Sequence, residues 1–210
     1  IATMCGNGIR CFSKFVYENN IVRNENFTVE TLGGIMKIKL IIEDGKVNLI
    51  KVNMGKPKFS SDELPISKDN ENFINEDIII NDKVLKISSL IMGTIHTVLF
   101  VDDFSDLDLS QIGQEIESNI LFPMKTNVNF CRIIDKENIE VITWEKGVGI
   151  TLACGTGAAA SAIISSIVHD CNKEINVKLE GGNLLIKQSG DEVFMTGAAG
   201  FICKGEYNFR

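Results

Sequence analysis

Two cysteines in this sequence stand in the same short pattern, Cys-Gly-x-Gly, directly before a stretch with helical spacing. The two copies are Cys5-Gly6-Asn7-Gly8 and Cys154-Gly155-Thr156-Gly157. Glycines let a backbone approach a ligand closely, and the free N–H groups of a first helical turn bind carboxylate or phosphate. The helix dipole also stabilises a thiolate just before the helix. One such turn is common for steric reasons alone, but two facing one anion site would form a thiol acid–base pair.

Three helices are predicted, and two of them follow the repeated pattern. They span about residues 8–18, 107–120 and 157–169. The first has apolar residues three and four apart on one face, and the second is acidic and amphipathic. The third is small and apolar almost all round, which predicts a buried helix that threads the middle of a sheet.

Strand signals dominate the rest of the chain. Segments rich in β-branched residues, several with alternating polarity, predict strands at 35–42, 46–54, 84–90, 96–101, 127–134, 139–144, 175–179, 184–188 and 200–205. The polar run 60–82 contains Pro65 and predicts a loop with a short edge element. The predicted fold class is therefore α+β, mostly strand.

Composition excludes several classes of function. The 210 residues hold 21 Lys and Arg against 28 Asp and Glu, a formal charge of −7 that argues against nucleic-acid or anionic-membrane partners. No apolar run approaches the ~18 residues that span a bilayer, and no signal peptide opens the chain. We therefore expect a cytoplasmic protein with no nucleic-acid or membrane partner.

The six cysteines predict free thiols rather than a disulfide framework or a metal site. No CxxC pair occurs and there are only two histidines, so we expect no structural zinc. Free cysteines are usually small buried hydrophobes, which is the expectation for Cys11, Cys131, Cys171 and Cys203.

The position of the first motif suggests a chain that lacks its N-terminal part. A long strand-rich stretch precedes the second motif, whereas only four residues precede Cys5 and the first residue is Ile1 rather than Met. If the two halves are duplicates, most upstream strands of the first half are absent. The alternative is a module that simply begins with a helix.

Six segments together resemble the diaminopimelate epimerase family. They are MCGNGIRCF at 4–12, NMGKP at 53–57, TNVNF at 126–130, WEKGVG at 144–149, TLACGTGAA at 151–159 and MTGAA at 195–199. The resemblance implies two pseudo-symmetric lobes, each a mostly antiparallel or mixed β-sheet wrapped around a central α-helix, with the active site in the cleft between them. Residues 1–54 and 200–210 would form the first, incomplete lobe, and 55–199 the second.

The same resemblance implies an enzyme that inverts an amino-acid α-carbon without pyridoxal phosphate, another cofactor or a metal. Cys5 and Cys154 match the two catalytic cysteines, one removing the α-proton as thiolate while the other returns a proton to the opposite face. His96 matches the partner of the first cysteine and Glu145 that of the second, and Asn127 matches a residue that contacts the substrate.

The backbone N–H groups at Gly6-Asn7 and Gly155-Thr156 would hold the α-carboxylate and its developing charge. Simpler roles stay open for several of these positions. His96 alone fits a buried structural histidine, and Glu145 next to Lys146 fits a solvated ion pair. Asn7 and Thr156 fit helix caps.

Departures from the family pattern bear on the substrate. The usual Gly-Asn-Pro-His is Gly93-Thr94-Ile95-His96, the usual Arg after the glutamate is Lys146, and Ile150 and Ala198 replace a Glu and a Pro. Thr94 and Lys146 thus join the predicted substrate-binding set, at the end of the substrate that an Arg fork would grip bidentately.

The predicted reaction is the cofactor-independent conversion of LL- to meso-diaminopimelate, for lysine and cell-wall synthesis. The expected partners are a small amino-acid substrate and a second copy of the chain in a homodimer. One alternative is a related racemase of another amino acid such as histidine. Others are a non-catalytic amino-acid-binding lobe and an isomerase of the same fold without the cysteine pair, such as the phenazine-biosynthesis-like group.

Overall fold

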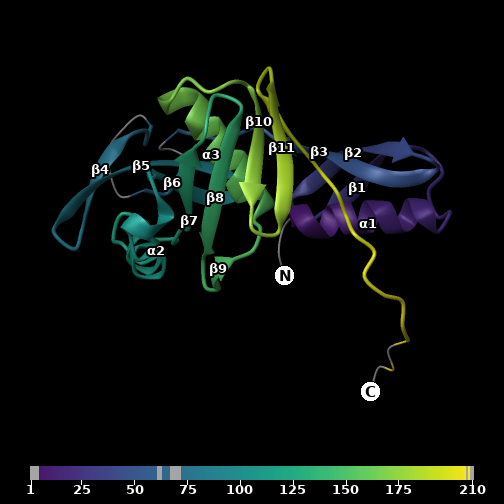
Figure 1. The fold of residues 1–210 in the computed structure, drawn as a ribbon, viewed down its shortest axis with the longest axis horizontal. Helices are drawn as coiled ribbons and strands as arrows, with labels where there is room; N and C mark the ends of the chain where they lie inside the picture. Colours follow the sequence, from purple (N-terminus) through teal and green to yellow (C-terminus); the bar gives the residue numbers. More distant parts are fainter. Residues whose placement is uncertain (1–4, 61–62, 67–71, 207, 209–210) are drawn as a thin grey trace.

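The structure is a computed structural model that describes residues 5–60, 63–66, 72–206 and 208 (Figure 1). Its elements in chain order are α1 (Gly6–Glu18), β1 (Asn26–Thr31), β2 (Gly34–Glu43), β3 (Lys46–Gly55), β4 (Glu76–Ile80), β5 (Lys83–Met92), β6 (Thr94–Phe100), a 3₁₀ turn (Phe104–Asp106), α2 (Leu109–Glu117), β7 (Asn127–Ile133), β8 (Asn138–Glu145), β9 (Gly149–Thr151), α3 (Gly155–Val168), β10 (Glu174–Leu179), β11 (Gly182–Ser189) and β12 (Glu192–Gly197).

The described strands form one mixed sheet. Its order is β1-β2-β3-β12-β11-β10-β8-β7-β6-β5-β4, with β9 paired to β8. The β8–β10 and β6–β7 pairs are parallel, and the other pairs are antiparallel. This arrangement, with few helices, confirms the predicted α+β class.

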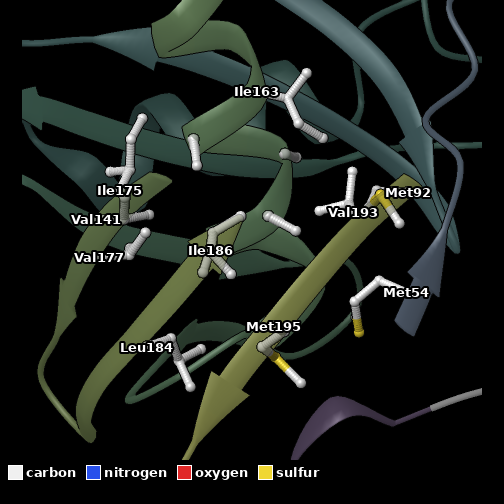
Figure 2. Packing of buried hydrophobic residues seen from close by; sticks show 14 of the residues in the cluster. Met54, Met92, Val141, Ile163, Ile175, Val177, Leu184, Ile186, Val193 and Met195 are labelled. Atoms are coloured by element: carbon white, nitrogen blue, oxygen red, sulfur yellow. The ribbon is translucent and has the colours of Figure 1, made fainter. Parts of the chain in front are cut away.

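Helix α3 lies in the centre of the larger part of the sheet, as Figure 1 shows. Residues Ala158 to Ser165 of the helix are all buried. Figure 2 shows Ile163 of α3 in one cluster with Ile175 and Val177 of β10 and Ile186 of β11. Small side chains let the strands close around the helix, so the predicted buried helix is confirmed.

Helix α1 is amphipathic and packs beside β2 and β3. Ile9, Ser13 and Val16 face inward, whereas Phe12 and Phe15 are 49% and 57% exposed. The three predicted helices are thus confirmed, with α1 and α3 beginning two residues earlier than the apolar spacing suggested. The early start follows from the cysteine caps described below.

The strand predicted at 200–205 is wrong. Residues 198–206 have no regular structure, and Phe201 and Ile202 are 73% and 90% exposed. The strand in this region is β12, which fills the position between β3 and β11. Within the part of the chain that the structure describes, residues 200–205 pair with no strand.

Two further strands were not predicted, and a third was predicted only as a short edge element. Strands β1 and β9 were not predicted, because β1 is flanked by polar residues and β9 has three residues. Strand β4 lies at the sheet edge within 60–82, which fits the predicted short edge element. Part of that predicted loop, 61–62 and 67–71, lies outside the described residues.

The expectation of buried structural cysteines is confirmed for Cys131 and Cys171 and wrong for Cys11 and Cys203, which are exposed. Cys11 lies on the outer face of α1, and Cys203 follows the last strand. The predicted division at 54/55 and 199/200 stays a prediction, since β3 and β12 from its two sides are hydrogen bonded to each other. Among the described residues, no helix has the length and apolar character needed to cross a membrane.

Candidate active site

The two Cys-Gly-x-Gly turns have the same structure. Cys5 and Cys154 are the N-cap residues of α1 and α3, both in extended conformation, with φ/ψ of −134°/113° and −123°/110°. The Cys5 Sγ accepts a hydrogen bond from Gly8 N and the Cys154 Sγ one from Gly157 N, each at 3.4 Å. The sequence repeat is therefore a structural repeat.

The two helix N-termini meet. A Cβ atom placed on Gly6 would lie 3.5 Å from the Gly155 Cα, and one placed on Gly155 would lie 2.9 Å from the Met195 Sδ. The Asn7 side chain donates from Nδ2 to the carbonyl of Ala153 at 3.3 Å. The structure thus brings both predicted anion-binding turns to one place, and only residues without a side chain fit at Gly155.

Arg10 is a residue of this junction that sequence reasoning missed. It is 9% exposed, and its guanidinium donates to the carbonyls of Ala198 (3.2 Å) and Gly6 (3.1 Å) and to the Asn7 Oδ1 (3.2 Å). Burial lowers the pKa of Arg10, while Cys11 and Cys5 raise it. The available signal was a charged residue directly after Ile9, next to the inward-facing side of α1.

Cys154 is buried at the base of the site. Burial raises the pKa of its thiol, and the charge of Glu145 raises it further. Hydrogen bonds from Thr156 and Gly157 oppose that shift, with the Thr156 Oγ1 at 3.5 Å from the sulfur. The net direction favours a protonated thiol at neutral pH.

Glu145 ends β8 beside this thiol. Its carboxylate accepts a hydrogen bond from the Thr151 hydroxyl in β9 at 2.7 Å. Lys146 instead donates from Nζ to the carbonyl of Met124 at 3.3 Å. No Glu145–Lys146 ion pair occurs among the described residues, so the solvated-pair interpretation is not supported.

His96 lies on β6 and is fully buried. Burial lowers the pKa of the imidazole to about 3, although a hydrogen bond from Asn129 opposes the shift. Its Nδ1 lies 3.2 Å from the Asn129 Nδ2, whereas its Nε2 has no hydrogen-bond partner among the described residues. The ring is therefore neutral, with one nitrogen satisfied and the other not.

Asn127 joins the strand ends that carry these partners. Its Nδ2 donates to the carbonyl of Ile95 at 3.0 Å, and its Oδ1 accepts from the Lys146 N–H at 2.9 Å. Thr94 follows the Gly93 turn, and a Cβ on Gly93 would lie 3.5 Å from the Thr156 Cγ2. Contact of Asn127, Thr94 and Lys146 with a substrate stays a prediction.

No group of three or more His, Cys, Asp or Glu suited to a metal ion occurs among the described residues. The chemistry available here is that of two thiols, one carboxylate, one neutral imidazole and two helix N-termini.

This fold is shared with proteins of known structure. One is a hydroxyproline epimerase from Agrobacterium vitis, with a TM-score of 0.70 and 13% identity over 93% of this chain and 64% of that chain. Such low identity shows the fold alone.

The sequence comparison is more specific. The diaminopimelate epimerase family model matches residues 1–60 and 88–202. Diaminopimelate epimerase of Caldanaerobacter subterraneus subsp. tengcongensis is 43% identical over 206 residues, which cover 98% of this chain and 75% of that protein. The Alkaliphilus metalliredigens enzyme of the same name is 42% identical over 208 residues, covering 98% and 73%. The chain belongs to the diaminopimelate epimerase family.

Proposed function

We propose that this protein interconverts LL- and meso-diaminopimelate without a cofactor, using Cys5 and Cys154 as a thiolate–thiol pair. The observation that carries the proposal is the meeting of two cysteine-capped helix N-termini at Gly6 and Gly155. The names of the relatives support the substrate.

Inversion at a carbon needs a proton acceptor on one face and a proton donor on the other. A thiolate removes the α-proton and becomes a thiol, the electron pair stays on a planar carbanion, and the second thiol donates its proton to the opposite face and becomes a thiolate. The two thiols have then exchanged protonation states. Cys154 suits the donor in the resting pair because burial and Glu145 favour its protonated form, which assigns the first proton abstraction to Cys5.

The α-carboxylate would bind at the first turns of α1 and α3. In α1 the N–H groups of Gly8 and Ile9 already donate to the Cys5 Sγ and carbonyl oxygen. In α3 those of Gly157 and Ala158 donate to the same atoms of Cys154. The preceding N–H groups of Gly6, Asn7 and Gly155 would be the ones that bind an anion and stabilise charge that develops on it, and the Thr156 N–H, which already interacts with the Cys154 thiol, would be shared with it.

The far end of the substrate would reach the turn at Thr94 and the end of β8 at Lys146. An ammonium group presents a point charge instead of the planar fork that arginine offers to a carboxylate. A lysine at position 146 therefore predicts weaker selection for substrates with a distal carboxylate. For this reason histidine should be tested as an alternative substrate in any assay.

The proposal is tested with the full-length protein in deuterated water. Deuterium is expected at an α-carbon of diaminopimelate, and the isomer formed should carry it after a single turnover. Cys5→Ala and Cys154→Ala should each abolish inversion, with Cys203→Ala as the matched exposed-thiol control. Exchange with histidine but not diaminopimelate would replace the substrate, and no exchange with any amino acid would refute the activity.

We also propose a cytoplasmic location and a homodimer. Six free cysteines, three of them exposed, support a reducing compartment. The homodimer rests on the family resemblance alone, and sedimentation velocity measured over a range of protein concentrations tests it.

A further inference from the structure

Asn129 occupies the space between the imidazole of His96 and the first turn of α3. It lies on β7 and is fully buried. Its side chain reaches His96 on β6, Thr143 on β8 and Gly157 of α3. Asn129 was not predicted as a site residue and lies outside both Cys-Gly-x-Gly copies, yet it contacts His96 and the first turn of α3.

The hydrogen bonds determine how the Asn129 amide is oriented. One partner is the carbonyl oxygen of Thr97, 3.1 Å away, which can only accept, so Nδ2 must lie on that side. On the other side the Thr143 hydroxyl lies 3.0 Å from the amide oxygen and donates to it. A flipped amide would place two acceptors together.

The orientation of the amide determines the tautomer of His96. Nδ2 has two hydrogens; one serves the Thr97 carbonyl, and the other points to the His96 Nδ1 at 3.2 Å. Nδ1 must therefore accept, and in a neutral ring the proton is then on Nε2. That N–H is buried and has no acceptor among the described residues.

The second glycine of the α3 motif makes room for this amide. A Cβ on Gly157 would lie 2.3 Å from the Asn129 Oδ1 and 3.0 Å from the Thr143 Oγ1. At Gly8, the equivalent position of α1, the nearest atoms are those of Cys5 itself, at 3.5 Å. The two copies of the repeat differ here because only the second has Asn129 beside it.

We propose that Asn129 is a positioning residue that holds His96 as the neutral tautomer with its proton on Nε2, so that the buried ring presents a hydrogen-bond donor on its Nε2 side. Neither cysteine sulfur accepts from this N–H in the structure. A hydrogen bond from it to a thiolate in the substrate complex rests on the proposed function, and in that complex His96 would act as a neutral donor and not as the base that removes the thiol proton.

The test is imidazole ¹⁵N NMR of the full-length protein at neutral pH. The chain has only two histidines, and His169→Gln assigns the remaining signal to His96. The wild type is expected to show a protonated Nε2 and an unprotonated Nδ1. A protonated Nδ1 in the wild type would overturn the proposal before any variant of Asn129 is made.

Asn129→Asp keeps the shape but replaces the donor with a carboxylate that only accepts. The His96 signal should move to a protonated Nδ1, and deuterium incorporation into diaminopimelate should fall about 10- to 100-fold in kcat with KM nearly unchanged. Asn176→Asp is the matched control, since it adds the same charge at an exposed strand position bonded to Asn138; it should change neither signal nor rate. If Asn129→Asp does not fold, Asn129→Ser should show both tautomers of His96.

An unchanged tautomer in these variants, or a changed tautomer with an unchanged rate, would refute the positioning role. If the wild type shows the expected NMR signals but no exchange, the proposed function is refuted. The effect of Asn129 on the tautomer of His96 is not.

Discussion

At the scale of residues, the two cysteines occupy equivalent turns in different surroundings. Cys5 is exposed, whereas Cys154 is buried with its pKa raised by burial and by Glu145. The residues predicted as their partners also differ, since Glu145 is partly exposed and bonded to Thr151, and His96 is fully buried. The two copies of the motif therefore have the same backbone structure but chemically different surroundings.

The buried His96 predicts a specific pH dependence of stability. Its folded pKa of about 3 lies below the ordinary 6.5, so the unfolded chain binds more protons between these values. The stability that His96 contributes is therefore fully present above pH 6.5 and is lost as the pH falls toward 3. In that range the free energy of unfolding should fall with a slope approaching ~1.4 kcal/mol per pH unit.

His96→Gln should remove this dependence. Urea unfolding of wild type and variant between pH 7 and 4 gives the slope of the unfolding free energy against pH for each. The contribution of the carboxylates, which titrate in both proteins, cancels in the difference between the two slopes. His169→Gln, at the end of α3, is the matched control and should keep the wild-type slope. Equal slopes for wild type and His96→Gln would show that His96 is not buried in neutral form.

At the scale of elements, the starts of α1 and α3 show how the same local sequence meets different neighbours. Gly8→Ala adds a methyl group with no atom closer than 3.5 Å, and alanine is the better helix former by up to ~1 kcal/mol. Gly157→Ala places its Cβ 2.3 Å from the Asn129 Oδ1, so the buried amide must move at a cost of ~1–3 kcal/mol.

The free energy of unfolding in urea should therefore rise slightly for Gly8→Ala and fall for Gly157→Ala. A loss of similar size in both variants would mean that both glycines are needed for the turn itself.

Arg10 connects α1 to the chain that leaves β12 through its hydrogen bonds to Gly6, Asn7 and Ala198. Arg10→Met removes the donor of these hydrogen bonds, of which the one to the Gly6 carbonyl is buried and the other two are partly buried, and the expected loss of stability is ~1–3 kcal/mol. Arg10→Lys should recover only part of it, because one ammonium cannot reproduce the fork. Arg23→Met, at an exposed position, is the control and should be nearly neutral in the same denaturation experiment.

The helices were predictable because their signals are local. An apolar face at helical spacing marks α1, and an apolar stretch without a polar side marks α3. The last strand of the chain was not predictable, because residues 192–197 and 200–205 both have a composition typical of strands. The position between β3 and β11 decides between them; β11 directly precedes β12, but β3 comes from a distant part of the chain.

At the scale of the whole molecule, the site depends on α1 and α3 meeting across one continuous sheet. Substrate bound to both helix N-termini would stabilise the junction, by ~2.7 kcal/mol at a concentration one hundred times Kd. Calorimetry with diaminopimelate should show a rise in Tm, while lysine, which lacks the distal carboxylate, should give a smaller one.

The variant Cys5→Ala/Cys154→Ala should keep this rise, because the proposed carboxylate site consists of backbone N–H groups, and should lose all exchange at the α-carbon. This pair of results separates binding from catalysis. A variant that binds and still exchanges would require another base.

The sequence by itself determined the family, the α+β class and the two cysteine-capped turns, because motif identity and helix capping depend on residues close together in the chain. The tertiary structure alone decided which strand pairs with β3, where Arg10 bonds and that Asn129 orients His96. Those contacts join residues 33 to 188 positions apart, and their energies depend on burial and on hydrogen-bond partners that no local pattern specifies.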